Sequence, residues 1–223
     1  SLIMAGVFYI VRNLVWSEGV FIANDFWKGF KQNALYFMLI TFLLGLVYFV
    51  SAMNIFIIDN NYIINPDSFF SKPFVSNLFK ALIIVMAGFV TIMALFAYTI
   101  TVTYKVKFRQ LIKNSFYLSL GLLPRNIVMA ALSFSPFLLL AIFGMNLMFL
   151  SSIMLGIVLL LGFSLAVIGW SIYSHWVFDK FINDRVEGAV KNRGIYAKVG
   201  RDGKPVNKKE YFKNPKKKKA VKP

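Results

Sequence analysis

Four long stretches of this chain have no charged residue in their centres, and this feature constrains the fold more than any other. The stretches cover residues of about 34–58, 81–104, 126–143 and 153–178. A helix of roughly 20 apolar residues crosses a bilayer core, and a soluble domain has no way to bury so many consecutive apolar side chains. The composition agrees, because 58% of the residues are hydrophobic and 15% are charged. We therefore predict an all-α polytopic membrane protein with four complete transmembrane helices, in which a transmembrane domain over 1–180 precedes a tail over 181–223.

A shorter apolar run opens the chain. Residues 1–11 end at Arg12 and are too few to cross a bilayer. They predict a partial N-terminal apolar helix, and we expect at least one further helix upstream of Ser1.

Two basic amphipathic stretches share one pattern. Residues 27–36 (WKGFKQNALY) recur 81 positions later as residues 108–117 (FRQLIKNSFY). Helices with aromatic residues on one face and cations on the other lie in the headgroup region of a membrane. We predict such helices at about 24–33, capped by Asn24 or Asp25, and at about 105–123, ended or bent by Pro124. Two interpretations remain open: a tandem repeat of helix plus transmembrane hairpin, or convergence of two interfacial helices.

The distribution of cations predicts the orientation. Segments 12–33 and 105–125 hold three and five Lys or Arg residues, and the tail from residue 179 holds fifteen. The loop at 59–73 holds one and the turn at 144–152 holds none. By the positive-inside rule, the cation-rich segments and the C-terminal tail lie in the cytoplasm of a multi-pass protein.

The composition offers little material for catalysis. There is no cysteine, one histidine and nine acidic residues, so we expect no enzyme, no metal site and no cofactor. His175 stands among Trp170, Tyr173 and Trp176, where a structural role in an interfacial aromatic belt is favoured over a pH-sensing or ligating role. The centres of the predicted spans also lack the ionisable residues that coupled carriers use. A stand-alone transporter is therefore disfavoured, and substrate-driven flux into liposomes containing the chain alone would contradict this.

The two basic stretches are the candidate binding surfaces. Their cations contact either lipid phosphates of the inner leaflet or a membrane protein partner. The candidate residues are Phe26, Trp27, Lys28, Phe30, Lys31, Lys107, Phe108, Arg109, Lys113 and Arg125.

The tail is rich in lysine and has few apolar residues, so it cannot build a core of its own. Its lysine run favours attraction to anionic lipid headgroups, with the phosphates of RNA or the ribosome as the rival partner. No RNA-binding motif is present, so we expect no specific nucleic-acid binding. The run consists of Lys213, Lys216, Lys217, Lys218 and Lys219.

Several short motifs occur in order along the chain: residues 9–12 (YIVR), 18–19 (EG) and 25–33 (DFWKGFKQN), and later 108–114 (FRQLIKN) with 123–125 (LPR). In these motifs and their spacing the chain resembles the YesL family of bacterial integral membrane proteins. The long lysine-rich tail departs from the family pattern.

This resemblance implies a multi-pass protein of the cell membrane of Gram-positive-type bacteria. Its family has no established biochemical activity and is often encoded beside carbohydrate ABC importers and polysaccharide-degrading enzymes. We therefore expect a non-enzymatic accessory or scaffold subunit of an oligosaccharide importer, with ABC permease subunits as partners. The alternative is a membrane protein insertion or biogenesis factor whose tail contacts the ribosome or nascent chains.

Overall fold

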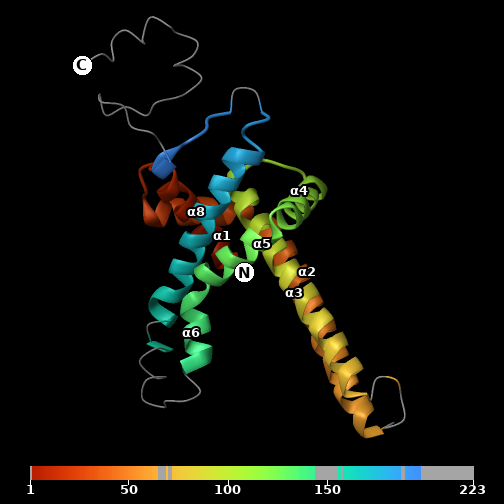
Figure 1. The fold of residues 1–223 in the computed structure, drawn as a ribbon. Coiled ribbons are helices and arrows are strands. Elements are labelled where there is room, and N and C mark those ends of the chain that lie inside the picture. Colours follow the sequence, from red (N-terminus) through yellow and green to blue (C-terminus); the bar gives the residue numbers. More distant parts are fainter. Residues whose placement is uncertain are drawn as a thin grey trace, which may run out of the picture. The chain divides into compact units, whose positions relative to one another are not determined.

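The computed structural model describes residues 2–64, 69, 72–143, 155–156, 158–186 and 189–196. This part of the chain is helical and contains no strand, so the predicted all-α class is confirmed. Figure 1 shows the helices in chain order. They are α1 (Leu2–Val15), α2 (Ile22–Ile64), α3 (Pro73–Thr103), α4 (Phe108–Gly121), α5 (Leu123–Ser133), α6 (Ser135–Phe143), a π-helical segment η2 (Val158–Gly162), α8 (Phe163–Phe181) and a short 3₁₀ turn η3 (Gly194–Tyr196).

The chain divides into two compact units. The first comprises residues 1–8 and 26–132, and the second comprises residues 9–25 and 133–223. The helices α1 and α2 each begin in one unit and continue into the other.

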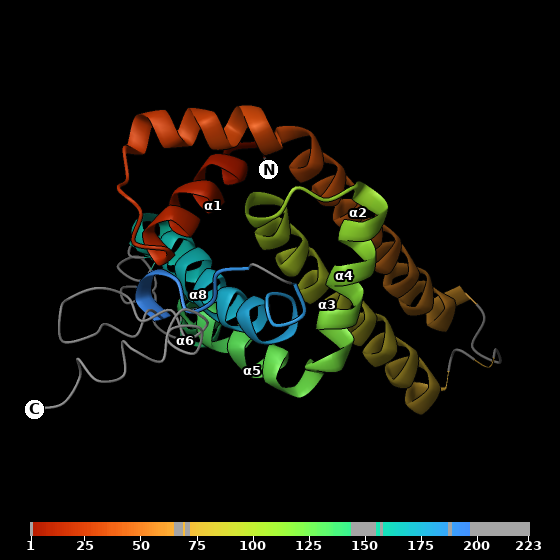
Figure 2. The ribbon, with the colours of Figure 1, turned by 90° about the horizontal axis from the view of Figure 1, so that it is seen from above.

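The first unit is built on a long antiparallel hairpin of α2 and α3, which lie side by side in both views (Figures 1 and 2). Thr41 Oγ1 lies 2.7 Å from Tyr98 Oη, and one heptad further along α2 Tyr48 Oη lies 2.6 Å from Thr91 Oγ1. Near the tip, Lys80 forms an ion pair with Asp59. The three pairs keep one antiparallel register, so polar contacts align two otherwise apolar helices.

Both helices of the hairpin are long and apolar enough to cross a membrane. At 1.5 Å per residue, α2 is about 64 Å long when followed along its axis and α3 about 46 Å, against a bilayer core of about 30 Å. Only 11% of the most apolar window of α2 and 28% of that of α3 is buried within the protein. The hairpin therefore presents most of its apolar surface outward, as a membrane-embedded hairpin does.

The prediction of four complete spans is not confirmed. Apart from α2 and α3, the described residues offer a third span only if the bent pair of α4 and α5, which meet at 96°, counts as one. The predicted span at 126–143 is interrupted at Phe134, where α5 has ended and α6 begins with Pro136 in its first turn, a position that proline tolerates. The predicted span at 153–178 lies partly outside the described residues, and its described part comprises residues 155–156, η2 and most of α8.

The second unit has a core formed by one face of α8. Trp170, Val177 and Phe178 are fully buried, and the ring of His175 contacts the rings of Trp16 and Phe178 at 5.5 and 5.6 Å. His175 is 4% exposed. It is therefore a core residue of this unit, and its aromatic partners differ from the three neighbours on its own helix that the sequence pointed to.

Candidate functional site

The first predicted binding helix is continuous with the first span. Figure 2 shows the opening turns of α2 running in a different direction from the rest of the helix. The helix starts at Ile22, so Asn24 and Asp25 lie in its first turns and not at the predicted cap position. Asp25 still supports the helix start, because its Oδ2 accepts a hydrogen bond of 3.0 Å from the backbone N–H of Phe21.

The aromatic residues at the start of α2 differ in their exposure to solvent. The ring of Phe26 packs so closely on Gly6 of α1 that a Cβ there would overlap it. Trp27 stacks edge-on against Phe26 and Phe30, at 5.8 and 5.6 Å, and remains 57% exposed. Lys28 and Lys31 are exposed on the same helix. Phe26 is thus packed within the protein, while the neighbouring Trp27, Lys28 and Lys31 are exposed.

The second predicted binding helix is α4, which packs on α3. Its buried strip is Leu111, Ser115 and Ser119, spaced one turn apart. Phe89 of α3 meets Phe116 of α4 at 5.8 Å between ring centroids. Lys107, Arg109 and Lys113 are exposed.

An aromatic contact joins the two helices. Tyr36 of α2 meets Phe108 at the start of α4, with ring centroids 5.7 Å apart. We define the basic surface as seven exposed residues at or near these two basic stretches: Trp27, Lys28, Lys31, Lys107, Arg109, Lys113 and Tyr117. Two segments separated by 81 positions in the sequence thus belong to one unit and share a contact.

Arg125 lies beyond the bend, exposed on the first turn of α5. The bend itself is held by Asn126, which is fully buried and was not predicted to matter. Its Nδ2 donates to the carbonyl oxygens of Leu118 and Ser119, at 3.0 and 2.9 Å. These carbonyls at the end of α4 lack helical partners, so one side chain satisfies both and fixes the angle between the helices. The tail lysines, Lys213 and Lys216 to Lys219, lie outside the described residues.

A second site in the other unit was missed by the sequence analysis. Residues 189–196, which we call the strap, were assigned to the tail, yet they pack against α8. The backbone N–H of Asn192 donates to Asp179 Oδ2 at 3.0 Å, and Lys191 forms an ion pair with Asp184. The Tyr196 hydroxyl donates to the carbonyl oxygen of Ile172. Burial raises the pKa of Tyr196, and the Asp179 carboxylate raises it further, so this hydroxyl keeps its proton.

The strap also contacts the end of α1 and the turn after it. Gly194 has a φ of +59°, and a Cβ there would overlap the backbone of Val15 and Trp16. The guanidinium of Arg193 lies 4.6 Å from the Trp16 ring and 3.3 Å from Glu18. Arg12 contacts the same two residues, at 4.7 and 3.8 Å. Glu18 and Trp16 therefore tie the strap to α1.

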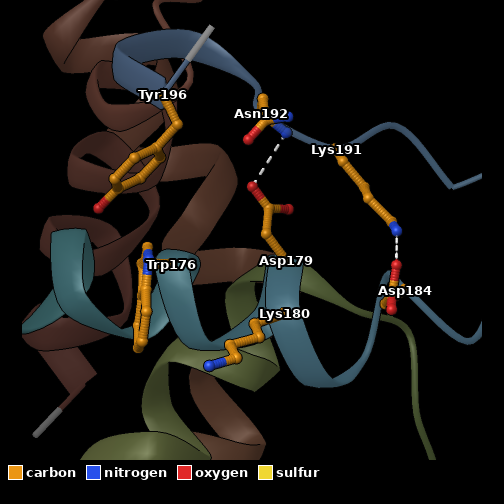
Figure 3. A pocket seen from close by; sticks show the side chains of 7 residues that line it. All are labelled: Trp176, Asp179, Lys180, Asp184, Lys191, Asn192 and Tyr196. Carbon is orange, nitrogen blue, oxygen red and sulfur yellow. Dashed lines mark hydrogen bonds and ion pairs between the residues drawn. The ribbon is translucent and has the colours of Figure 1, made fainter. Parts of the chain in front are cut away.

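Between the strap and α8 lies a cavity of about 270 Å³. Figure 3 shows Asn192 and Asp179 facing one another, with Lys191 and Asp184 paired on one side and Tyr196 and Trp176 on the other. The lining residues are Trp176, Asp179, Lys180, Asp184, Lys191, Asn192 and Tyr196. In the part of the chain that the structure describes, no group of three His, Cys, Asp or Glu residues is placed to hold a metal ion.

No protein-family model, curated protein or solved structure matches this chain. The basic surface and the strap cavity are therefore the features from which a function is inferred.

Proposed function

We propose that this chain is a non-enzymatic accessory or scaffold subunit of a bacterial membrane complex, and that the complex is a carbohydrate ABC importer. The α2–α3 hairpin anchors the chain in the bilayer. The basic surface, on the cytoplasmic side, docks on a permease subunit.

The basic surface carries the docking part of this proposal. Trp27 and Tyr117 are 57% and 59% exposed beside exposed cations. Tryptophan, tyrosine and arginine are the residue types that dominate binding energy at protein interfaces. The importer part rests on the resemblance of residues 9–12, 18–19, 25–33, 108–114 and 123–125 to the YesL family.

A competing use of the same residues is anchoring to lipid. Lysine and arginine near the surface of an anionic leaflet gain about 1 kcal/mol each, and interfacial tryptophan and tyrosine are common in membrane proteins. The two uses differ in what is lost when the charge is reversed, so one experiment separates them.

The test combines Lys31→Glu with Arg109→Glu, one change on each helix. Full-length protein is purified from its host in a mild detergent, and co-purifying proteins are quantified by mass spectrometry. Wild type is expected to bring permease subunits in stoichiometric amount, and the double variant to lose them while its amount in the membrane stays normal. The matched control is Lys72→Glu, an exposed cation between α2 and α3 and outside the basic surface. It should retain the partners.

Two results would contradict the proposal. If the double variant keeps its protein partners but no longer binds vesicles with anionic lipid, the basic surface is a lipid anchor. If ribosomal or translocon proteins replace permease subunits in the wild-type sample, the chain is an insertion or biogenesis factor.

A further inference from the structure

The strap cavity has walls of balanced charge. Two carboxylates and two ammonium groups line it, and Lys191 and Asp184 neutralise one another as an ion pair. An anionic ligand would face Asp179, and a cationic ligand would face Lys180. The lining therefore favours a ligand without net charge.

The polar groups of the cavity retain unused hydrogen-bonding capacity. Asp179 accepts two hydrogen bonds, from the Asn192 backbone and from Asn183 Nδ2 at 2.8 Å. An ionised carboxylate has about four acceptor positions. Within the described residues, the Lys180 ammonium and the Asn192 side-chain amide form no hydrogen bond, although the Lys180 Nζ lies 5.5 Å from the centres of both the Trp176 and the Phe181 rings. The cavity thus offers free donors and free acceptors together.

The other walls are aromatic. Trp176 and Tyr196 flank the polar groups on one side of the cavity (Figure 3). A ligand that fits must therefore combine an apolar face with groups that both donate and accept hydrogen bonds. Hydroxyl groups do both, and a pyranose ring carries them around its edge while its C–H groups form an apolar face. At about 270 Å³, the cavity lies near the lower limit of small-molecule sites, which suits a single sugar ring.

We propose that the cavity between the strap and α8 is a binding site for a neutral sugar of monosaccharide size. Asp179 accepts hydrogen bonds from sugar hydroxyls. Lys180 and the Asn192 amide donate to them, and the ring packs against the aromatic wall. The site is formed by residues of the second unit alone, so it does not depend on the docking proposed for the basic surface.

The experiment is isothermal titration calorimetry on the full chain in lipid nanodiscs. Glucoside and maltoside detergents are avoided because their headgroups would themselves offer the ligand. The probes are glucose, galactose and N-acetylglucosamine, with glucose 6-phosphate as the anionic probe and glycerophosphoethanolamine as the zwitterionic one. We expect at least one neutral sugar to bind and to bind more tightly than either charged probe.

Two variants locate the binding. Asn192→Gly removes the side-chain amide, keeps the backbone N–H that donates to Asp179 and tolerates the φ of +51° found at this position. Lys180→Met keeps an apolar side chain over Trp176 and removes the ammonium. Each is expected to weaken sugar binding about tenfold, the size expected when a hydrogen-bonding partner is removed. Ile195→Ala, on the same strap, exposed and outside the cavity lining, should bind as wild type does.

Three results would overturn the proposal. One is the absence of sugar binding to the wild-type chain, which needs no variant to be measured. Another is tighter binding of a charged or zwitterionic probe. The last is sugar binding that neither Asn192→Gly nor Lys180→Met weakens. Permease recovery with Asn192→Gly, measured as for the basic surface, should be unchanged, so failure of this site and failure of the docking proposal can be told apart.

Discussion

The two basic stretches have similar sequences but continue differently. After Tyr36 the chain stays helical to Ile64, so the first stretch is the opening part of the 43-residue helix α2. After Tyr117 the helix ends at Gly121 and the chain turns by 96° into α5. Pro124 accounts for part of this difference, because a proline fits the first turn of a new helix and disfavours helical geometry in the residue before it.

The buried faces differ as well. Gly29 and Phe37 are buried in α2, whereas Gln110, which aligns with Gly29, is exposed in α4. The buried strip of α4 begins at Leu111, one position later. One residue corresponds to a rotation of about 100° around a helix. The shared pattern therefore specifies an amphipathic helix in both places but not which side packs, and the tandem repeat is not confirmed.

The largest loss of stability should follow from a substitution at the bend between α4 and α5. Asn126→Leu would leave the carbonyl oxygens of Leu118 and Ser119 without their donor in a buried place, at a cost of about 1–3 kcal/mol for each unsatisfied group. The control is Asn33→Leu on α2, because Asn33 Nδ2 donates at 3.0 Å to the carbonyl of Gly29, one turn earlier in the same helix. Stability is measured by denaturant unfolding in mixed micelles. Equal losses for the two variants would show that Asn126 does not hold the bend.

The angle of the same bend can be monitored through the distance between two labelled positions, one on α4 and one on α5. The chain has no cysteine, so two cysteines introduced at the exposed positions Gln110 and Val128 can be spin-labelled without background. Asn126→Leu is expected to broaden or shift the distance distribution between them, and Asn33→Leu to leave it unchanged.

A smaller effect should come from the buried faces. Ser115 of α4 is fully buried, and its aligned residue Ala34 on α2 is half-buried. Ser115→Leu would overpack the contact between α4 and α3, which costs about 1–3 kcal/mol, while Ala34→Leu has room to turn its side chain outward. Thermal unfolding in nanodiscs compares the two. A larger loss for Ala34→Leu would mean that α4 packs through a different face.

The sequence predicted the long hairpin well. Length and apolarity suffice for α2 and α3, since a membrane helix satisfies its own backbone and needs no particular partner. The break at Phe134 was not predicted, because residues 126–143 remain apolar across it and hydropathy does not register a change of direction. Pro124 indicated a bend. Its angle depends on Asn126, whose two acceptors lie seven and eight residues earlier in the chain.

The candidate sites, like the fold, could be predicted from the sequence only in part. The exposed cations and aromatic residues of the basic surface could be chosen from the amphipathic pattern, but their joining through Tyr36 and Phe108 required tertiary structure. The strap was assigned to the tail because it cannot form a core alone. It is ordered by contacts with Val15, Trp16 and Glu18, which lie far away in the sequence, and the left-handed Asn192 and Gly194 were the available signal.

The smallest expected effect concerns the contact between the two basic stretches. Tyr36→Leu and Phe108→Leu, made singly and together, form a double-mutant cycle for the contact at 5.7 Å. An aromatic pair of this kind contributes about 0.5–1.5 kcal/mol beyond burial, so we expect a coupling free energy of that size. The control cycle combines Tyr36→Leu with Trp27→Leu. Trp27 is the residue on α2 that aligns with Phe108, and its ring contacts are to Phe26 and Phe30. That cycle should be additive. If both cycles are additive, the two stretches do not support one another, and the basic surface is two independent helices.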